Sequence, residues 1–271
     1  MNVVLTRSAQ QLAERAAGLL ESRIEHNVLA TVLDAASAHA DPNDLFAIVE
    51  DDCGAVSGAA MRVGGRRLLA SVMDEPSAAL LIERWLSADP DVPGVAGLAE
   101  VARAVARAWE QRTGGRSALA MAMALHMLDR VEGPARPAAG ALRPAAEPDR
   151  DRLIEWMGDF AREAGVEDNP VHMVDRRPLY VWDDGEPVSV VGLNAPVAGA
   201  ARIGPVYTPR HLRGRGYASS AVASVSTSAL DAGARQCILY TDLANPGSNR
   251  IYAALGYRRV ADWEERSFIT Q

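Results

Sequence analysis

The sequence of 271 residues contains no lysine, so all 28 of its basic residues are arginines. These arginines are scattered, and 35 acidic residues give a formal net charge of −7. The chain therefore lacks the basic stripe that binding to a phosphate backbone requires, and we expect no nucleic-acid partner. Only Cys53 and Cys237 occur, and the histidines show no ligand spacing. We thus expect neither a disulfide framework nor a metal site.

The sequence also lacks a long apolar run. The longest nearly apolar stretch, 118–128, is far shorter than the roughly 20 residues that cross a bilayer, so we expect no membrane association. The first residues, 1–7, show no basic region followed by an apolar region and a cleavage site, and we expect a cytoplasmic protein. With 48% hydrophobic and 23% charged residues, the composition is that of a globular protein with one large or two small domains.

A segment rich in proline, glycine and alanine, 133–148, divides the sequence. Its four prolines prevent a continuous helix, and such punctuation between two periodic segments typically marks a connection. We therefore place a domain boundary near residue 135, with domains at 1–135 and 136–271. Each domain is then of ordinary size for a small domain.

Both domains are predicted to combine helices and strands in a mixed α/β order. In the C-terminal domain we expect a helix at 149–164, strands at 179–182, 188–193 and 201–208, a helix ending at 231 and a strand at 236–241. In the N-terminal domain we expect helices at 9–21, 76–88 and 98–112 and strands at 68–73 and 118–128. The order of elements predicts two copies of one fold, although no residue-level repeat is visible.

A glycine-rich loop carries the first candidate chemistry. It leads from a strand into a helix and reads Arg213-Gly214-Arg215-Gly216-Tyr217-Ala218-Ser219. Unpaired N–H groups at a helix start favour an anion such as pyrophosphate, and glycine lets the backbone approach it closely. Alone, the loop is equally compatible with a plain structural turn. It is not a Walker loop, because no Gly-Lys-Ser/Thr follows.

Two further features flank the loop. Pro205 interrupts an apolar strand, and proline in a sheet belongs at an edge or a bulge. A bulge would free the amides of Val206 and Tyr207 to pair with an extended ligand or to polarise a carbonyl group. Downstream, Asn249 and Tyr252 lie three residues apart on one helix face, and a tyrosine near a strand end can act as a general acid. An ordinary edge strand and a packed tyrosine are the alternatives.

These three features, in this order and spacing, resemble the GNAT superfamily of acyl-CoA-dependent N-acetyltransferases over the C-terminal domain. Arg213, Gly216 and Ala218 match that family's R/Q-x-x-G-x-G/A pyrophosphate motif, and the separation of seven from Asn245 to Tyr252 matches its Asn and helix-borne Tyr. The resemblance implies that Tyr252 protonates the departing CoA thiolate. It also implies that the cofactor is held by Val206, Tyr207, Arg213, Gly214, Arg215, Gly216, Tyr217, Ala218, Ser219, Asn245 and Asn249.

By this resemblance the fold is a tandem of GNAT-type domains, each a mostly antiparallel twisted sheet flanked by helices. The C-terminal domain is then expected to move the acetyl group of acetyl-CoA, its cosubstrate, directly to an amine acceptor without a metal. These residues do not identify the acceptor. The alternative, from another functional class, is a non-catalytic acyl-CoA-binding or scaffold protein.

The N-terminal domain is expected to be a degenerate, non-catalytic copy. Its strand at 68–73 is followed by Asp74 and Glu75, whose charges repel a pyrophosphate. Three roles stay open for this domain: shaping the acceptor cleft, forming a homodimer surface, or stabilising the chain.

The sequence does not identify a general base. Some members of the resembled family carry a glutamate on the strand that spans 237–241 here, and no glutamate occurs in it. Water, Asp242, Glu264 and Glu265 are left as alternatives.

Three carboxylates, Glu155, Asp159 and Glu163, recur every four residues along the helix predicted at 149–164. A solvated outer face is the simpler interpretation of this spacing. The other interpretation is that they recruit a cationic acceptor, since the resemblance implies that the first helices border the acceptor site.

Overall fold

The computed structural model describes residues 1–38, 41–134, 136–166 and 168–270, and its contacts divide the chain into two compact units. The first unit comprises Met1–Ala124 and Ala261–Gln271, and the second comprises Leu125–Val260. Ala135, at which the sequence places the domain boundary, lies outside the described residues. The division found from the contacts falls earlier in the chain than that boundary.

The proline-rich segment packs within the second unit, which explains the earlier division. The backbone N–H of Ala138 donates to Ser220 Oγ at 2.9 Å, and the indole N–H of Trp182 donates to the carbonyl oxygen of Ala139 at 2.7 Å. The segment thus connects two domains in sequence but belongs to one of them in space.

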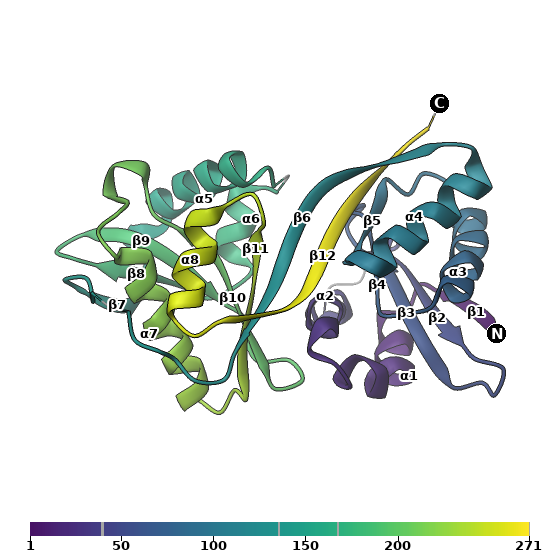
Figure 1. Ribbon diagram of the computed structural model, residues 1–271, viewed down its shortest axis with the longest axis horizontal. Helices are drawn as coiled ribbons and strands as arrows, with labels where there is room; N and C mark the ends of the chain where they lie inside the picture. Colours follow the sequence, from purple (N-terminus) through teal and green to yellow (C-terminus); the bar gives the residue numbers. More distant parts are fainter. Residues whose placement is uncertain (39–40, 135, 167, 271) are drawn as a thin grey trace. The chain divides into compact units, whose positions relative to one another are not determined.

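The first unit has a mixed α/β fold (Figure 1). Its elements are β1 (Asn2–Thr6), α1 (Ala9–Glu21), α2 (Asn27–Ala38), β2 (Leu45–Glu50), β3 (Val56–Arg62), β4 (Leu68–Ala70), α3 (Glu75–Ala88), β5 (Gly94–Leu98), α4 (Ala99–Thr113) and β6 (Arg116–Leu128). Strands β1 to β4 pair antiparallel in sequence order, and β4 pairs parallel with β5.

The second unit repeats this order of elements, as the sequence predicts for two copies of one fold. Its elements are β7 (Ala141–Pro144), α5 (Arg150–Ala164), α6 (Pro170–Asp175), β8 (Leu179–Asp183), β9 (Pro187–Leu193), β10 (Ala200–Tyr207), α7 (Tyr217–Asp231), β11 (Gln236–Asp242) and α8 (Pro246–Ala254). The last strand in the order, β12 (Arg258–Ile269), follows α8 in the chain but lies mostly in the first unit. Strands β7 to β10 pair antiparallel, and β10 pairs parallel with β11. The predicted mixed fold with mostly antiparallel pairing is confirmed.

The last strand of each copy completes the sheet of the other copy. β12 follows α8 in the chain, yet Trp263–Ser267 pair antiparallel with Gly94–Leu98 of β5 inside the first unit. β6 follows α4, yet its end, Leu125–Leu128, belongs to the second unit, where β6 lies beside β11. Gly94 makes the first exchange possible, because a Cβ atom at this residue would overlap the carbonyl oxygen of Arg266.

Alternate side chains of β8 and β9 place the helices of the second unit on opposite faces of its sheet. Val181 and Val190 pack with residues of α5 and α6 in one core cluster. Trp182 and Val191, the next residue in each strand, pack with residues of α7 and α8 in the other. The helices that follow the two parallel strands therefore share one face (Figure 1).

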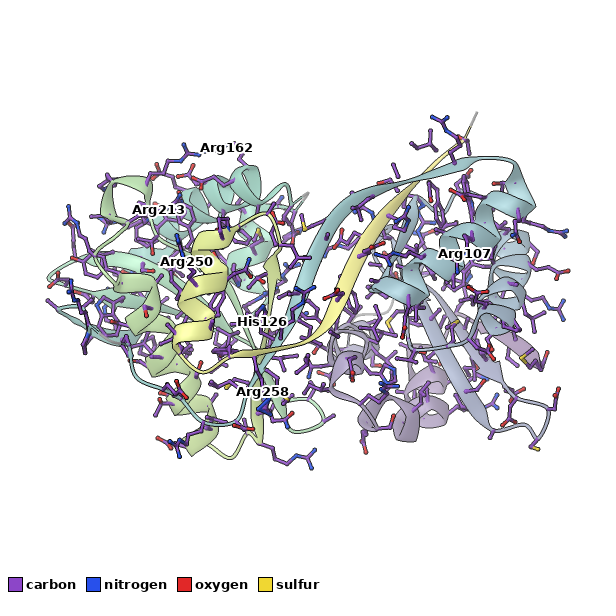
Figure 2. The ribbon with its side chains drawn as sticks, in the orientation of Figure 1. Arg107, His126, Arg162, Arg213, Arg250 and Arg258 are labelled. Carbon is purple, nitrogen blue, oxygen red and sulfur yellow. The ribbon has the colours of Figure 1, made fainter. Side chains whose placement is uncertain are left out.

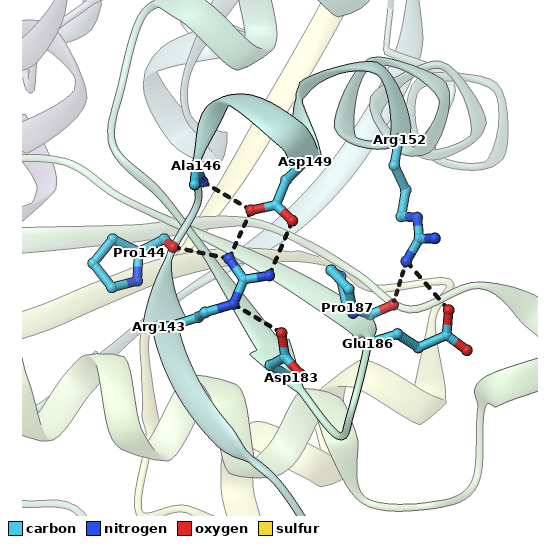
Figure 3. Close-up of polar contacts among 8 residues, drawn as sticks. All are labelled: Arg143, Pro144, Ala146, Asp149, Arg152, Asp183, Glu186 and Pro187. Atoms are coloured by element: carbon cyan, nitrogen blue, oxygen red, sulfur yellow. Dashed lines mark hydrogen bonds and ion pairs between the residues drawn. The ribbon is translucent and has the colours of Figure 1, made fainter.

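An arginine cluster fixes the start of α5 (Figure 3). The Arg143 guanidinium on β7 donates to both carboxylate oxygens of Asp149, at 2.7 and 3.0 Å, and to Asp183 at 2.8 Å. Asp149 is buried, and the hydrogen bonds from Arg143 hold the pKa of its carboxyl group below the ordinary value. The neighbouring Arg152 contacts Glu186 at 3.4 Å with both side chains largely exposed.

A buried histidine in the first unit has its tautomer fixed by two backbone groups. His26 Nε2 accepts a hydrogen bond from the N–H of Val72 at 3.2 Å, so Nδ1 carries the proton and donates to the carbonyl oxygen of Leu19 at 2.8 Å. The side chain is 1% exposed, and burial lowers its pKa from 6.5. His26 is therefore neutral at pH 7.

Among the residues described, no helix is both long enough and apolar enough to cross a membrane.

Candidate functional site

The parallel strands β10 and β11 form the centre of the site. Their ladder pairs Ala200–Arg202 with Gln236–Ile238, so the described pairing ends before the carboxyl end of β10. The register of β10 against β9 then shifts between Ile203 and Val206, as the bulge predicted at Pro205 requires. Beyond this point the edge of β10 that faces β11 is free of ladder bonds to β11 in the described pairing.

Val206 and Tyr207, predicted to hold an extended ligand, lie immediately after the bulge. They sit opposite Val191 and Val190 of β9. Because consecutive N–H groups of a strand point to opposite edges, one of the two amides is directed toward β9 and the other toward the edge that faces β11. A single amide at this position can therefore bind an extended ligand.

The glycine-rich loop and the start of α7 follow the carboxyl end of β10. Gly216 is the N-cap residue of α7, has φ of 85°, and provides no side chain to cap the helix. Gly214 has φ of 79°, and no atom lies within 4 Å of the position that a Cβ would take. The first amides of α7 thus face a loop whose backbone is open to an anion.

The corresponding helix of the first unit differs at this position. α3 follows β4 of the parallel β4–β5 pair, and the carboxylate of Asp74 accepts a hydrogen bond from the N–H of Ser77 at 2.9 Å. The hydrogen bonds with Ser77 lower the pKa of Asp74, so the carboxylate is ionised at neutral pH. One helix start is capped by a negative side chain and its counterpart is not.

Two side chains of the loop and the first turn of α7, Arg213 and Tyr217, bind other parts of the second unit. Arg213 donates to the carbonyl oxygen of Thr208 and to Glu163 of α5, each at 2.8 Å, and its guanidinium lies 5.6 Å from the ring centre of Tyr207. Tyr217 is buried and donates to Asp184 at 2.8 Å, while Ser219 and Ala218 form the first turn. The loop therefore offers its backbone, and Arg213 offers a cation that is paired with Glu163 (Figure 2).

The carboxylates of α5 are not simply a solvated face. Tyr207 donates to Asp159 at 3.3 Å, and Arg210 donates to Glu163 at 2.9 Å. The hydrogen bonds from Arg213 and Arg210 lower the pKa of Glu163. The two carboxylates border a cavity of about 530 Å³, which is also lined by Glu155, Trp156, Arg162, Tyr207, Pro209, Arg210 and His211.

The start of α8 follows the carboxyl end of β11, so it lies at the same edge as the start of α7. Asn245 caps α8 through a hydrogen bond from the N–H of Ser248 at 3.2 Å. Asn249 donates to the carbonyl oxygens of Asp242 and Asn245 at 3.2 and 2.9 Å. Both predicted asparagines therefore hold the β11–α8 turn.

Tyr252 lies one turn further along α8 and is 8% exposed. Its ring packs edge-on against Tyr257, with centroids 5.9 Å apart. Burial raises the pKa of Tyr252 to about 12. The phenol therefore keeps its proton at neutral pH, as a proton donor must.

The carboxylates left open as general bases are engaged elsewhere. Glu264 binds Arg103 and Arg266, and Glu265 binds Arg67 at 3.1 Å, all within the first unit. Asp242 accepts a hydrogen bond from the N–H of Ala244 at 2.8 Å.

Sequence reasoning missed His126, at the end of β6, whose Nε2 lies 3.2 Å from Thr241 Oγ1 (Figure 2). Thr241 Oγ1 in turn donates to Asn249 Oδ1 at 2.6 Å. The only signal for His126 in the sequence is that it is a polar residue in the apolar strand predicted at 118–128. Its partner Thr241 is too far away in the sequence for a local pattern to connect the two.

Residues 142–257 match the model of the acetyltransferase (GNAT) family. No curated protein sequence matches the chain significantly. The chain resembles a GCN5-related N-acetyltransferase from Sphaerobacter thermophilus, with a TM-score of 0.61 and 16% identity over 99% of this chain and 96% of that chain.

Two other solved structures resemble the chain over nearly its whole length. An acetyltransferase of the GNAT family from Colwellia psychrerythraea has a TM-score of 0.63 at 12% identity and covers 100% of both chains. A tandem GNAT protein from the clavulanic acid biosynthesis pathway has a TM-score of 0.61 at 16% identity and covers 98% of each. The chain thus has the fold of the GNAT superfamily, and its second unit contains the segment that matches the family model.

Proposed function

We propose that the chain is an acetyl-CoA-dependent N-acetyltransferase whose second unit moves an acetyl group directly to an amine acceptor. The observation that carries the proposal is the uncapped start of α7 behind a loop with room at Gly214. Phosphate groups bind such helix starts through backbone N–H groups and the helix dipole. The residues present therefore fit the pyrophosphate of a CoA thioester.

Acetyl-CoA supplies an activated acetyl group as a thioester. The free amide at Val206 or Tyr207 binds the carbonyl oxygen and stabilises the charge that develops on it. Tyr252, which is protonated at neutral pH, donates its proton to the departing thiolate. Asn245 and Asn249 hold the turn that faces the pantetheine arm.

The cavity beside Tyr207 is our candidate for the acceptor site. Its carboxylates, Asp159 and Glu163, bind N–H and O–H donors in the structure. An acceptor that arrives as an ammonium ion can replace these donors with its own N–H groups. The first unit, whose helix start is capped by Asp74, is proposed to be non-catalytic.

Calorimetric titration with acetyl-CoA tests the binding step. The double variant Gly214→Glu with Gly216→Glu places two charges in the loop and is expected to abolish binding. The matched control, Gly64→Glu with Gly65→Glu, places the same charges in a turn of the first unit, where both glycines have positive φ and open surroundings, whereas a Cβ at Gly216 would lie 3.3 Å from the carbonyl oxygen of Arg136. Equal loss in both double variants, or no binding by the parent chain, would contradict the proposal.

A second variant separates an enzyme from the non-catalytic acyl-CoA-binding protein. Tyr252→Phe removes the proton donor and keeps the ring that packs on Tyr257. We expect it to lose turnover by about 10²- to 10⁴-fold while it binds acetyl-CoA as the parent does. If neither the parent nor Tyr252→Phe releases CoA thiol with any amine while both bind acetyl-CoA, the chain is a binding protein.

A further inference from the structure

The hydrogen bonds around His126 run in one direction, which fixes its tautomer. Asn249 Nδ2 donates to two backbone carbonyl oxygens, so Asn249 Oδ1 must be an acceptor. The hydroxyl of Thr241 therefore donates to Oδ1, at 2.6 Å, and its oxygen is left to accept from His126 Nε2 at 3.2 Å. The imidazole thus carries its proton on Nε2, and the lone pair is on Nδ1.

His126 Nδ1 is buried and has no hydrogen-bond partner among the described residues, although the side chain is only 7% exposed. A buried acceptor without a donor destabilises the folded chain. Such a cost is relieved by an ordered water or by a ligand that donates to the lone pair. Nδ1 is therefore a prepared site for an N–H or O–H donor from outside the chain.

The imidazole is linked by hydrogen bonds to the turn between β11 and α8, which the proposed function assigns to the cofactor arm. Thr241 is the next-to-last residue of β11, and the hydrogen-bonded Asn249 stands one helical turn before Tyr252 on α8. Burial lowers the pKa of His126 from 6.5, and the positive charge of Arg259 on β12 lowers it further. The ring is neutral at pH 7 and can accept a proton.

We propose, on the basis of the function proposed above, that His126 is the proton acceptor of the reaction. The ammonium group of the acceptor gives one proton, through a chain of bound waters, to His126 Nδ1. The hydrogen bond from Nε2 to Thr241 is unchanged when the ring becomes an imidazolium, because Nε2 donates in both states. The network that ends at Asn249 therefore keeps the basic atom at Nδ1.

The remaining steps balance protons and bonds. The neutral amine forms a bond from nitrogen to the acetyl carbon, and the bond from carbon to sulfur breaks. Tyr252 gives its proton to the thiolate and regains one from the nitrogen of the new amide. His126 then loses its proton to solvent, so one proton is released in each turnover.

Two variants distinguish a proton acceptor from a merely structural histidine. His126→Gln keeps an N–H donor for Thr241 but has no basic atom, and we expect kcat to fall by about 10²- to 10⁴-fold with the KM for acetyl-CoA unchanged. Thr241→Val is the matched control, because it removes the tautomer-fixing hydrogen bond and leaves Nδ1. In Thr241→Val, kcat is expected to fall as the pH drops below 6.5, as it does in the parent chain. His126→Gln is expected to lose this acid limb of the pH profile.

A measurement on the parent chain decides the question without turnover. In ¹⁵N-histidine-labelled protein, long-range ¹H–¹⁵N correlation spectra are expected to show the Nε2–H tautomer and a pKa below 6.5 for His126. An Nδ1–H tautomer, a pKa above 7, or a His126→Gln variant with the parent's kcat and acid limb would overturn the assignment. Failure of acetyl-CoA to bind in the calorimeter would instead overturn the proposed function and leave the tautomer result standing.

Discussion

Substituting alanine for one glycine of the loop tests its effect on stability and on the proposed binding of acetyl-CoA separately. Gly214→Ala adds a Cβ at φ of 79° into open space, so its cost to folding is conformational strain without a clash. Gly185, in the turn between β8 and β9, has φ of 84° and equally open surroundings. A left-handed alanine costs about 1–2 kcal/mol, and each variant should therefore unfold about 2–8 °C lower than the parent.

The two variants should differ in affinity for acetyl-CoA. The new Cβ at Gly214 enters the open space that the proposed function assigns to a phosphate oxygen. Loss of one hydrogen bond to a charged group costs about 1.5–3 kcal/mol, which corresponds to a rise in Kd of about 10- to 150-fold. Gly185→Ala leaves the loop unchanged, so its Kd should equal that of the parent.

Calorimetric titration with acetyl-CoA and thermal unfolding of the same samples test this reasoning. Equal weakening of binding by Gly185→Ala and Gly214→Ala would show that backbone strain, and not the cradle, controls affinity. Parental affinity in Gly214→Ala would show that the pyrophosphate binds elsewhere. Either result would refute the argument from the loop geometry.

Three further predictions concern stability. Because the pKa of His26 is lowered, the unfolded chain binds the proton more readily, so the free energy of unfolding in urea should fall as the pH drops below 6.5, and this fall should be absent in His26→Gln. Gly94→Ala should destabilise the chain by about 3 kcal/mol or more through overlap with the exchanged strand, whereas Gly18→Ala, in the open middle of α1, should stabilise it by about 0.5–1 kcal/mol. Arg143→Gln leaves the buried carboxylate of Asp149 without its main partner and should lower the free energy of unfolding by about 2 kcal/mol. Arg152→Gln removes an exposed ion pair and should change the free energy of unfolding, measured by chemical denaturation, by less than about 1 kcal/mol.

Features set by local chemistry could be predicted from the sequence. Proline at position 205 cannot donate to a ladder, and the register shift occurs there. Gly214 and Gly216 adopt the positive φ that glycine allows, at the start of the predicted helix. The repeated order of elements was also correct, because periodicity and turn residues determine it within each copy.

Features set by distant contacts could not be predicted. The sequence predicts no strand between the helices expected at 76–88 and 98–112, and the two glycines in Gly94–Leu98 weaken the strand pattern there. It is a fully buried strand because β4 and the exchanged β12 pair with it on either side. The hydrogen bond between His126 and Thr241 depends on β6 reaching the second unit, and no local pattern in either segment encodes that contact.

The two copies differ at the helix start to which the proposed function assigns the pyrophosphate. Both have a helix that follows the first strand of a parallel pair, so both place a helix start at the carboxyl edge of the sheet. In the first copy Asp74 supplies the negative charge that this position favours, and the helix start is satisfied from within the chain. In the second copy Gly216 supplies no side chain, so a ligand must provide the charge. The same dipole therefore stabilises the fold in one copy and is left for binding an anion in the other.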